Sequence, residues 1–256
     1  MQEYKKPLFQ KGRVLKKEGL ELLRDFPYEF ARLWLKDCSD GILFGFDISY
    51  GKEEGKEGQI VVGAGAVWHE GQIVLTEQET FPFALFDHPV KIWLRFLPNQ
   101  ITEDFFVCPL EISVENQEQE KEGMELGRFR LSKGARLRKD YRDLQDFSTA
   151  YNTLDVTHVP YAGTDGITVS PVLLQVFARM ILENPSARET DVNFAFLCLN
   201  ASPVSRKCLL WYISRRLGTP YRELSHSEIY QCLVQIAGTG SRSIQEKRRK
   251  EGPAVF

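Results

Sequence analysis

The stretch QIVVGAGAVWHEGQIVLTE, residues 59–77, decides the fold of this chain. It contains two runs rich in β-branched residues, separated by a Glu-Gly pair that is typical of a tight hairpin turn. Its glycines also raise the alternative of a dinucleotide-binding loop. That loop needs a third glycine and then a helix, but Trp68 stands in the third position after Gly63 and Gly65, and a strand pattern follows. We therefore predict paired strands bent at Gly63 and Gly65, with no ligand held by their backbone amides.

Similar short patterns flank this stretch on both sides. Each is bounded by Gly, Pro, Asp, Asn or charged residues, and no helical pattern of crossover length lies between them. This spacing favours an antiparallel sandwich or barrel-like domain over βαβ units. The predicted strands lie within residues 41–49, 59–68, 71–83, 90–98, 104–115 and 125–132. The charged run 49–59 reads as a hairpin tip.

A helical period precedes the strands. Within residues 17–38 the apolar positions recur every three or four residues, as on one face of a helix. Pro27 stands in the middle of this run, and we predict that one helix ends and another begins there. The apolar positions are Leu20, Leu22, Leu23, Phe26, Phe30, Leu33 and Trp34.

The second half of the chain returns to the helical period. Four amphipathic segments joined by short turns predict a small bundle. Their ends carry recognisable capping residues: Ser170 with Pro171, Ser202-Pro203 as a stop, Gly218, and a Ser225/Glu228 capping box. The predicted helices are 170–184, 190–201, 203–218 and 225–238, the last closing at Gly238.

These patterns predict an α+β protein: an N-terminal helix plus an antiparallel β-sandwich or barrel-like domain, followed by a small C-terminal helical bundle. We place the helix and β-domain at residues 1–139, a linker at 140–168, the four-helix domain at 169–240 and a mobile basic tail at 241–256. Within the linker, Tyr141, Leu144 and Phe147 are spaced to form a short docking helix.

Composition excludes several classes. The chain has 256 residues and a net charge of only −2, so no global field attracts nucleic acid or an anionic membrane. Its five cysteines are odd in number and lack paired spacing, which predicts reduced core residues and no zinc site. No signal-peptide or membrane-spanning run is visible, and we expect a cytoplasmic protein. The cysteines are Cys38, Cys108, Cys198, Cys208 and Cys232.

No catalytic constellation can be named from spacing. The histidines, His69, His88, His158 and His226, are scattered, and we expect none of them to lie near a nucleophile as part of a triad. We therefore predict no catalytic, cofactor-binding or metal-binding residue, no cofactor and no small-molecule substrate. The basic clusters 136–139 and 246–250 lack interleaved aromatic residues and read as solvated surface, which argues against nucleic acid. The pair Trp211-Tyr212 reads as core.

Four segments taken in order carry a family resemblance. They are PLFQKGRVLKKEGLELLRDFP (7–27), SDGILFGFDIS (39–49), IVVGAGAVWHEGQIVLTE (60–77) and LGRFRLSKGARLRKDY (126–141). Their order resembles the N-terminal half of structural proteins from phage tail baseplates and related contractile injection systems, over residues 7–139. It resembles more faintly the type VI secretion baseplate adaptors, in which a β shoulder domain precedes helices and the protein is a homo-oligomer.

The resemblance implies a function. It implies a non-enzymatic structural or adaptor component that associates with itself and with other tail or baseplate proteins, made in the cytoplasm and assembled into a larger apparatus. Two other classes stay open. One is a hydrolase or transferase with a site between the β-domain and the helices, and the other is a nucleic-acid-associated regulator that uses the C-terminal helices and the basic tail.

Overall fold

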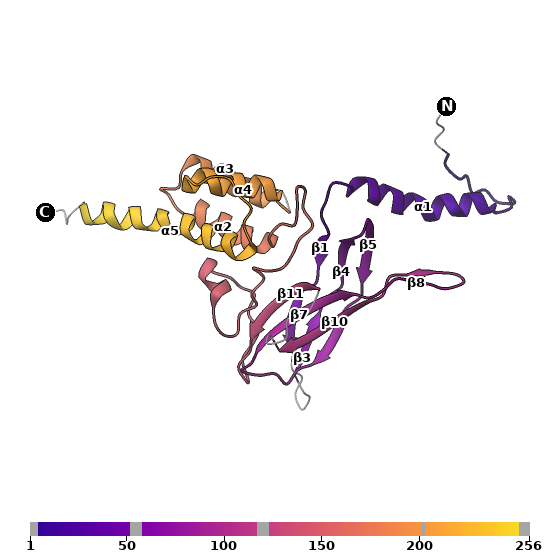
Figure 1. Ribbon diagram of the computed structural model, residues 1–256, viewed down its shortest axis with the longest axis horizontal. Helices are drawn as coiled ribbons and strands as arrows, with labels where there is room; N and C mark the ends of the chain where they lie inside the picture. The colour runs from indigo at the N-terminus through magenta and orange to yellow at the C-terminus, as the bar shows by residue number, and fades with distance from the viewer. Residues whose placement is uncertain (1–4, 52–57, 117–122, 201–202, 251–256) are drawn as a thin grey trace.

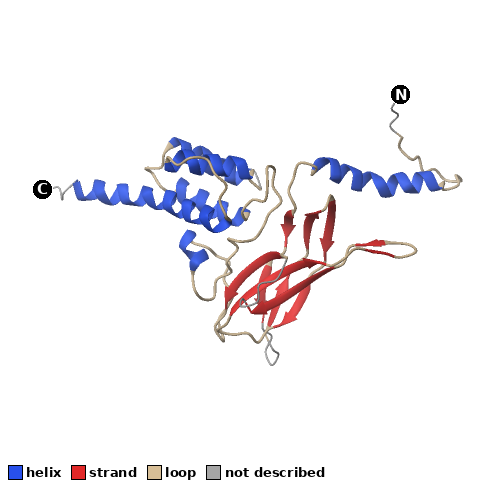
Figure 2. Ribbon diagram, in the orientation of Figure 1, coloured by secondary structure: helices blue, strands red, loops and turns tan. Residues whose placement is uncertain are grey.

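The computed structural model describes residues 5–51, 58–116, 123–200 and 203–250, with side chains described as far as Gly238. A projecting N-terminal helix, antiparallel sheets and four C-terminal helices follow one another along the chain (Figures 1 and 2). The predicted α+β class is confirmed. The strands form separate antiparallel sheets and do not close into a barrel.

The decisive stretch belongs to a bent three-stranded meander. Its upper part is the sheet β1 (Gly41–Gly45), β4 (Gly65–His69) and β5 (Gln72–Thr76), in the order β1-β4-β5. Its lower part is the sheet β2 (Ile48–Gly51), β3 (Gln59–Val62) and β6 (Glu79–Pro82), in the order β2-β3-β6. Each of the three predicted strands in this region is therefore two strands in two sheets. Residues 52–57, at the predicted hairpin tip, lie outside the described part of the chain.

The bend occurs where two chain corners pack on each other. Phe46 has a φ of 58°, and its N–H donates to the carbonyl of Ala64 at 3.1 Å, while the N–H of Gly63 donates to the carbonyl of Asp47 at 2.9 Å. A Cβ on Gly65 would lie 2.4 Å from the Phe46 ring. Only a residue without a side chain allows this approach. The predicted bend at the glycines is confirmed, and it redirects the strands into a second sheet.

The hairpin between β4 and β5 is the tight turn that the sequence predicts. Glu70 has a φ of 47° and Gly71 a φ of 79°, as in a type I′ turn, and His69 pairs with Gln72 across it. Trp68 lies in β4, and strand β5 follows where a dinucleotide-binding loop needs a helix. The nucleotide alternative is therefore excluded at this stretch.

A third sheet is built around β7 (Pro89–Phe96), with β10 (Leu110–Asn116) and β11 (Met124–Arg130) on its two sides. Between β7 and β10 the chain forms a two-stranded hairpin, β8 (Gln100–Ile101) and β9 (Phe106–Val107). The single strand predicted over 104–115 is wrong, because Pro109 interrupts it: proline cannot donate a hydrogen bond to a neighbouring strand.

The N-terminal helix α1 runs unbroken from Lys17 to Trp34 with Pro27 inside it. The prediction of two helices separated at Pro27 is wrong. Proline removes one backbone hydrogen bond from a helix, but its fixed φ is compatible with helical geometry, so the chain can continue at a cost of about 3 kcal/mol. The helix projects from the sheets and contacts β5 (Figure 1).

Four α-helices make up the C-terminal part: α2 (Pro171–Leu182), α3 (Glu189–Asn200), α4 (Arg206–Leu217) and α5 (His226–Lys250). The capping predictions at Ser170, Gly218 and Ser225 are confirmed. The prediction that the last helix closes at Gly238 is wrong, because α5 continues for three further turns. Gly238 does not adopt the left-handed conformation that ends a helix. Of the predicted stop at Ser202-Pro203, Ser202 lies outside the described residues.

The buried apolar side chains form two clusters, which we call the sheet cluster and the helix cluster. The sheet cluster joins residues from the three larger sheets with Leu154 and Val159. The helix cluster joins α2 to α5 with Tyr141, Leu144 and Phe147. The last three residues flank and form η1, a 3-10 helix at Leu144–Ser148, which confirms the predicted docking helix. The domain boundaries remain a prediction.

Among the described residues, none of the helices combines the length and the apolar character needed to cross a membrane.

Candidate functional site

The segment between the two clusters, residues 138–158, ties the sheets to the helices. Tyr141 stacks on Phe147 with ring centroids 4.1 Å apart inside the helix cluster. Its hydroxyl donates to the carbonyl of Leu154 at 2.7 Å, and the Leu154 side chain lies in the sheet cluster. Burial raises the pKa of Tyr141, so its hydroxyl stays protonated and keeps donating. One aromatic side chain thus links the two cores.

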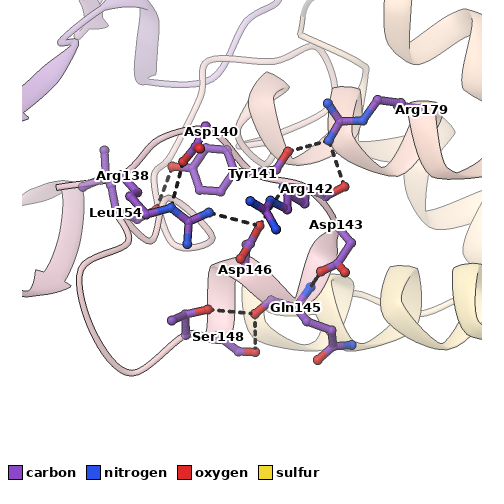
Figure 3. A network of polar contacts seen from close by, with 11 residues as sticks. Arg138, Asp140, Tyr141, Arg142, Asp143, Gln145, Asp146, Ser148, Leu154 and Arg179 are labelled. Carbon is purple, nitrogen blue, oxygen red and sulfur yellow. Dashed lines mark hydrogen bonds and ion pairs between the residues drawn. The ribbon is translucent and has the colours of Figure 1, made fainter. Parts of the chain in front are cut away.

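A polar network holds this segment against α2 (Figure 3). Arg179 of α2 donates to the backbone carbonyls of Tyr141 and Arg142. Asp146 of η1 accepts from the backbone N–H of Arg142 at 2.6 Å and lies 3.7 Å from the Arg138 guanidinium. Because one guanidinium donates to both carbonyls, these backbone groups have hydrogen-bond partners within the protein and do not need water. The network therefore fixes the path of the segment.

A second chain of hydrogen bonds joins this segment to the start of α5. Ser227 Oγ lies 2.9 Å from His158 Nε2, and His158 Nδ1 lies 2.8 Å from Thr157 Oγ1. Thr157 Oγ1 donates to Asp155 Oδ1 at 2.6 Å. Because the threonine hydroxyl proton points to the carboxylate, its oxygen accepts from Nδ1–H. Nε2 is then left to accept the Ser227 hydroxyl proton.

Burial lowers the pKa of His158, and the positive charge of Arg128 lowers it further. The imidazole is therefore neutral near pH 7 and can act as a base toward Ser227. A serine, a histidine and a carboxylate in this order are the components of a hydrolytic triad, although here a buried threonine separates the histidine from the carboxylate. The sequence prediction that no histidine stands near a nucleophile is wrong in space. The pair was missed because 69 residues separate His158 from Ser227.

A cavity of about 290 Å³ lies between the sheets and α2. Apolar side chains of both parts line most of it, together with Tyr141, Tyr161 and Ser170. The ion pair between Lys139 Nζ and Asp47, at 2.6 Å, belongs to its lining. His158 and Ser227 are not among its lining residues. The cavity and the Ser227–His158 pair are therefore separate features.

Helix α1 carries the largest exposed apolar surface among the described residues. None of its residues is buried. We call the apolar face of this helix the α1 stripe, and its exposed members are Leu22, Leu23, Phe26, Phe30, Leu33 and Trp34, with 36, 51, 59, 56, 64 and 75% of their surface in contact with solvent. Monomeric proteins rarely leave such contiguous apolar surface open, so the stripe marks a contact site.

The hairpin β8–β9 exposes a smaller apolar surface. Ile101, Phe105 and Phe106 are 85, 70 and 53% exposed. The hairpin extends away from the third sheet on the same side of the molecule as the free end of α1 (Figure 1). Two apolar projections thus extend from the same end of the protein. The sequence predicted a strand and a helix at these places but did not predict that both would be exposed.

The other histidine, cysteine and aromatic residues noted in the sequence have structural surroundings. His69 flanks the turn at Glu70 and Gly71: its Nδ1 lies 2.9 Å from Asp40, and its ring stacks 3.7 Å from Phe96. All five cysteines are free, and burial raises the pKa of Cys198 to about 12, which makes that thiol unreactive. Tyr212 packs in the helix cluster as predicted, but Trp211 is 46% exposed and is not core.

Metal ligation and phosphate contact have few candidates in space among the described residues. Within the described ranges, no three His, Cys, Asp or Glu side chains are grouped so that they could hold a metal ion. In the basic cluster 136–139, Arg138 pairs with Asp140 at 2.9 Å and Lys139 pairs with Asp47, so two of its charges are balanced within the protein.

The comparisons with known proteins find a likeness in structure and none in sequence. No protein-family model matches the sequence, and no curated protein matches it. A crystal structure of TssK is similar with a TM-score of 0.36 and 11% sequence identity, over 93% of this chain and 69% of that chain. A likeness this distant supports no argument about shared function.

Proposed function

We propose that this chain is a non-enzymatic structural or adaptor component of a phage-tail-like baseplate or contractile injection or secretion apparatus. It acts through protein–protein assembly, with copies of itself and with other tail or baseplate proteins, after synthesis in the cytoplasm. The observation that carries the proposal is the α1 stripe: an 18-residue helix without one buried residue has no structural reason to be apolar within the single chain.

Two further features support assembly over catalysis. The sheets and helices are joined by the Tyr141 hydrogen bond and the network of Figure 3, which are contacts that a scaffold can use. The apolar projections lie on α1 and the β8–β9 hairpin, where a partner can reach them. The assignment to a contractile apparatus rests on the resemblance of residues 7–139 to baseplate proteins, because the likeness to TssK carries no argument.

Particle fractionation tests the proposal. Cells that produce the epitope-tagged chain are lysed, and contractile particles are collected by ultracentrifugation. We expect the chain to sediment with the particles and the particle yield to fall sharply when its gene is deleted. An unrelated tagged protein of similar mass is the control and stays in the supernatant. If the chain also stays there, and particle yield does not change on deletion, the proposal is contradicted.

A hydrolase or acyltransferase that uses Ser227 is the second candidate, and the 2.9 Å contact with His158 Nε2 favours it. An activated serine reacts with a fluorophosphonate probe. If Ser227 is a nucleophile, the probe labels the protein at this residue, Ser227→Ala abolishes labelling, and the control Ser225→Ala, two residues earlier, keeps it. Without labelling, the pair is a structural tie between the segment and α5.

The nucleic-acid alternative depends largely on residues 246–250. Their side chains lie outside the described part of the structure. The described residues offer no observation that favours it over assembly.

A further inference from the structure

We infer that α1 is the self-association element of this protein and that the α1 stripe binds the same stripe of a second copy. This inference rests on the proposed assembly function and names the surface and the partner. It follows from the spacing and the area of the stripe and from the grooves beside it.

The spacing of the stripe is that of a helix that packs against another helix. Leu23, Phe26, Phe30 and Leu33 recur at intervals of three, four and three residues, which is the heptad spacing of a coiled-coil seam. At about 100° per residue, Leu22 and Trp34 lie on the two sides of this seam and widen the apolar face. A face this wide is typical of a helix within a bundle.

The exposed area is that of a real interface. An aromatic side chain offers about 150–250 Å² and a leucine on the order of 100 Å², so the exposed fractions of the six members leave roughly 600 Å² of apolar surface open. Stable interfaces bury about 800 Å² per partner. The exposed Leu8, Phe9 and Leu15, beside the first turn of α1, supply the remainder.

The stripe also has grooves that a second helix can enter. A groove of about 480 Å³ is lined by the apolar residues Pro7, Leu22, Leu23 and Phe26, with the charged residues Lys5, Lys6, Asp25 and Glu29 around them. A second groove of about 520 Å³ shares Leu22 with it and continues along residues 5–16. Side chains of a partner stripe are apolar and of the size that fills such grooves, as in knobs-into-holes packing.

The charges of α1 lie mostly away from the seam. On a helical wheel, Lys17 and Arg24 fall close to Tyr28, on the face opposite the seam, and Arg24 pairs there with Asp25 at 2.6 Å. The two sides of the seam carry Leu22 and Trp34, so two stripes can meet along apolar side chains.

The same charges exclude other occupants. The helix carries three basic and four acidic residues, so it offers no excess positive charge to an anionic membrane or to nucleic acid. Within one copy, Arg24 pairs with Asp25 and Arg32 pairs with Glu29, and both side chains of each pair are exposed to solvent. Exchanging such pairs for pairs between copies costs little.

The first test measures mass in solution by light scattering after gel filtration. We expect the unsubstituted protein to be larger than one 29.5 kDa chain and Phe30→Glu to raise the dissociation constant at least about tenfold. Tyr28→Glu is the matched control: Tyr28 is 68% exposed on the opposite face of the same helix, and the substitution should leave the mass unchanged. Circular dichroism checks that all three proteins are folded. The inference is overturned by equal effects of the two substitutions, or by a monomeric unsubstituted protein.

The second test places the seam at the contact. Leu23→Cys and Leu33→Cys are oxidised separately and as a mixture, with the unsubstituted protein as the background for the native thiols. Parallel helices give a new cross-linked dimer in each variant alone, and antiparallel helices give it only in the mixture. Either result supports the α1 interface, and the absence of a new cross-link from all three samples overturns it.

Self-association through α1 and the proposed baseplate function can each be wrong without the other. If the protein is monomeric but still sediments with contractile particles, self-association through α1 is wrong and the assembly function stands. If the protein self-associates through α1 but never sediments with particles, the baseplate assignment is wrong and the α1 interface stands.

Discussion

Gly45→Ala is expected to destabilise the β region by about 3–5 kcal/mol, because two separate costs coincide there. Gly45 has a φ of +85°, which an alanine adopts only with strain, and a Cβ at this position would lie 2.3 Å from the carbonyl oxygen of Ala64. That oxygen accepts the hydrogen bond from Phe46 that holds the two corners together. Backbone cannot move aside as a flexible side chain can, so the corner must open.

The chain supplies two matched controls for this experiment. Gly71 has a φ of +79° but nothing within 4 Å of the added Cβ, so Gly71→Ala should cost only about 1–2 kcal/mol of backbone strain. Gly51 has neither a positive φ nor a neighbour, and Gly51→Ala should be close to neutral. Urea unfolding followed by tryptophan fluorescence measures all three. Equal losses at Gly45 and Gly71 would show that the corner contact is unimportant.

Asp191→Ala is expected to lower the free energy of unfolding by about 3–5 kcal/mol, since it breaks a buried ion pair from one side. Asp191 is 2% exposed and accepts from Arg216 Nε at 2.9 Å and from the Tyr212 hydroxyl at 2.9 Å. Removal of the carboxylate leaves the Arg216 guanidinium 12% exposed beside α3 without this counter-charge. A buried charge that loses its partner retains the full desolvation cost.

The control is Glu189→Ala, an exposed acidic residue on the first turn of the same helix, which should cost no more than about 1 kcal/mol. The double variant Asp191→Leu with Arg216→Met should be less destabilised than the sum of the two single variants, because it removes both charges together. Unfolding by urea, followed by far-ultraviolet circular dichroism, reports on the helices. An additive double variant would contradict the ion-pair explanation.

Features set by neighbouring residues could be predicted from the sequence. The capping residues Ser170, Gly218 and Ser225 act within one helical turn, and all three are confirmed. The hairpin at Glu70 and Gly71 was predicted for the same reason, because its conformation depends on two adjacent residues.

Features set by distant contacts could not be predicted. The division of each strand at the corner depends on the ring of Phe46 meeting Gly65, 19 positions later in the printed sequence. The pairing of Ser227 with His158 depends on how the helix cluster sits against residues 138–158. Whether a side chain is exposed also depends on distant parts of the chain. The apolar period of α1 is that of a helix packed on a core, but the structure shows that no residue of α1 is buried.

The tie between Tyr141 and Leu154 has a mechanical consequence. Tyr141 stacks inside the helix cluster while its hydroxyl donates to the carbonyl of Leu154, so a force on the helices reaches the sheets partly through this one side chain. In the proposed assembly, a load on the helical part would therefore pass to the sheets across a single phenolic hydrogen bond.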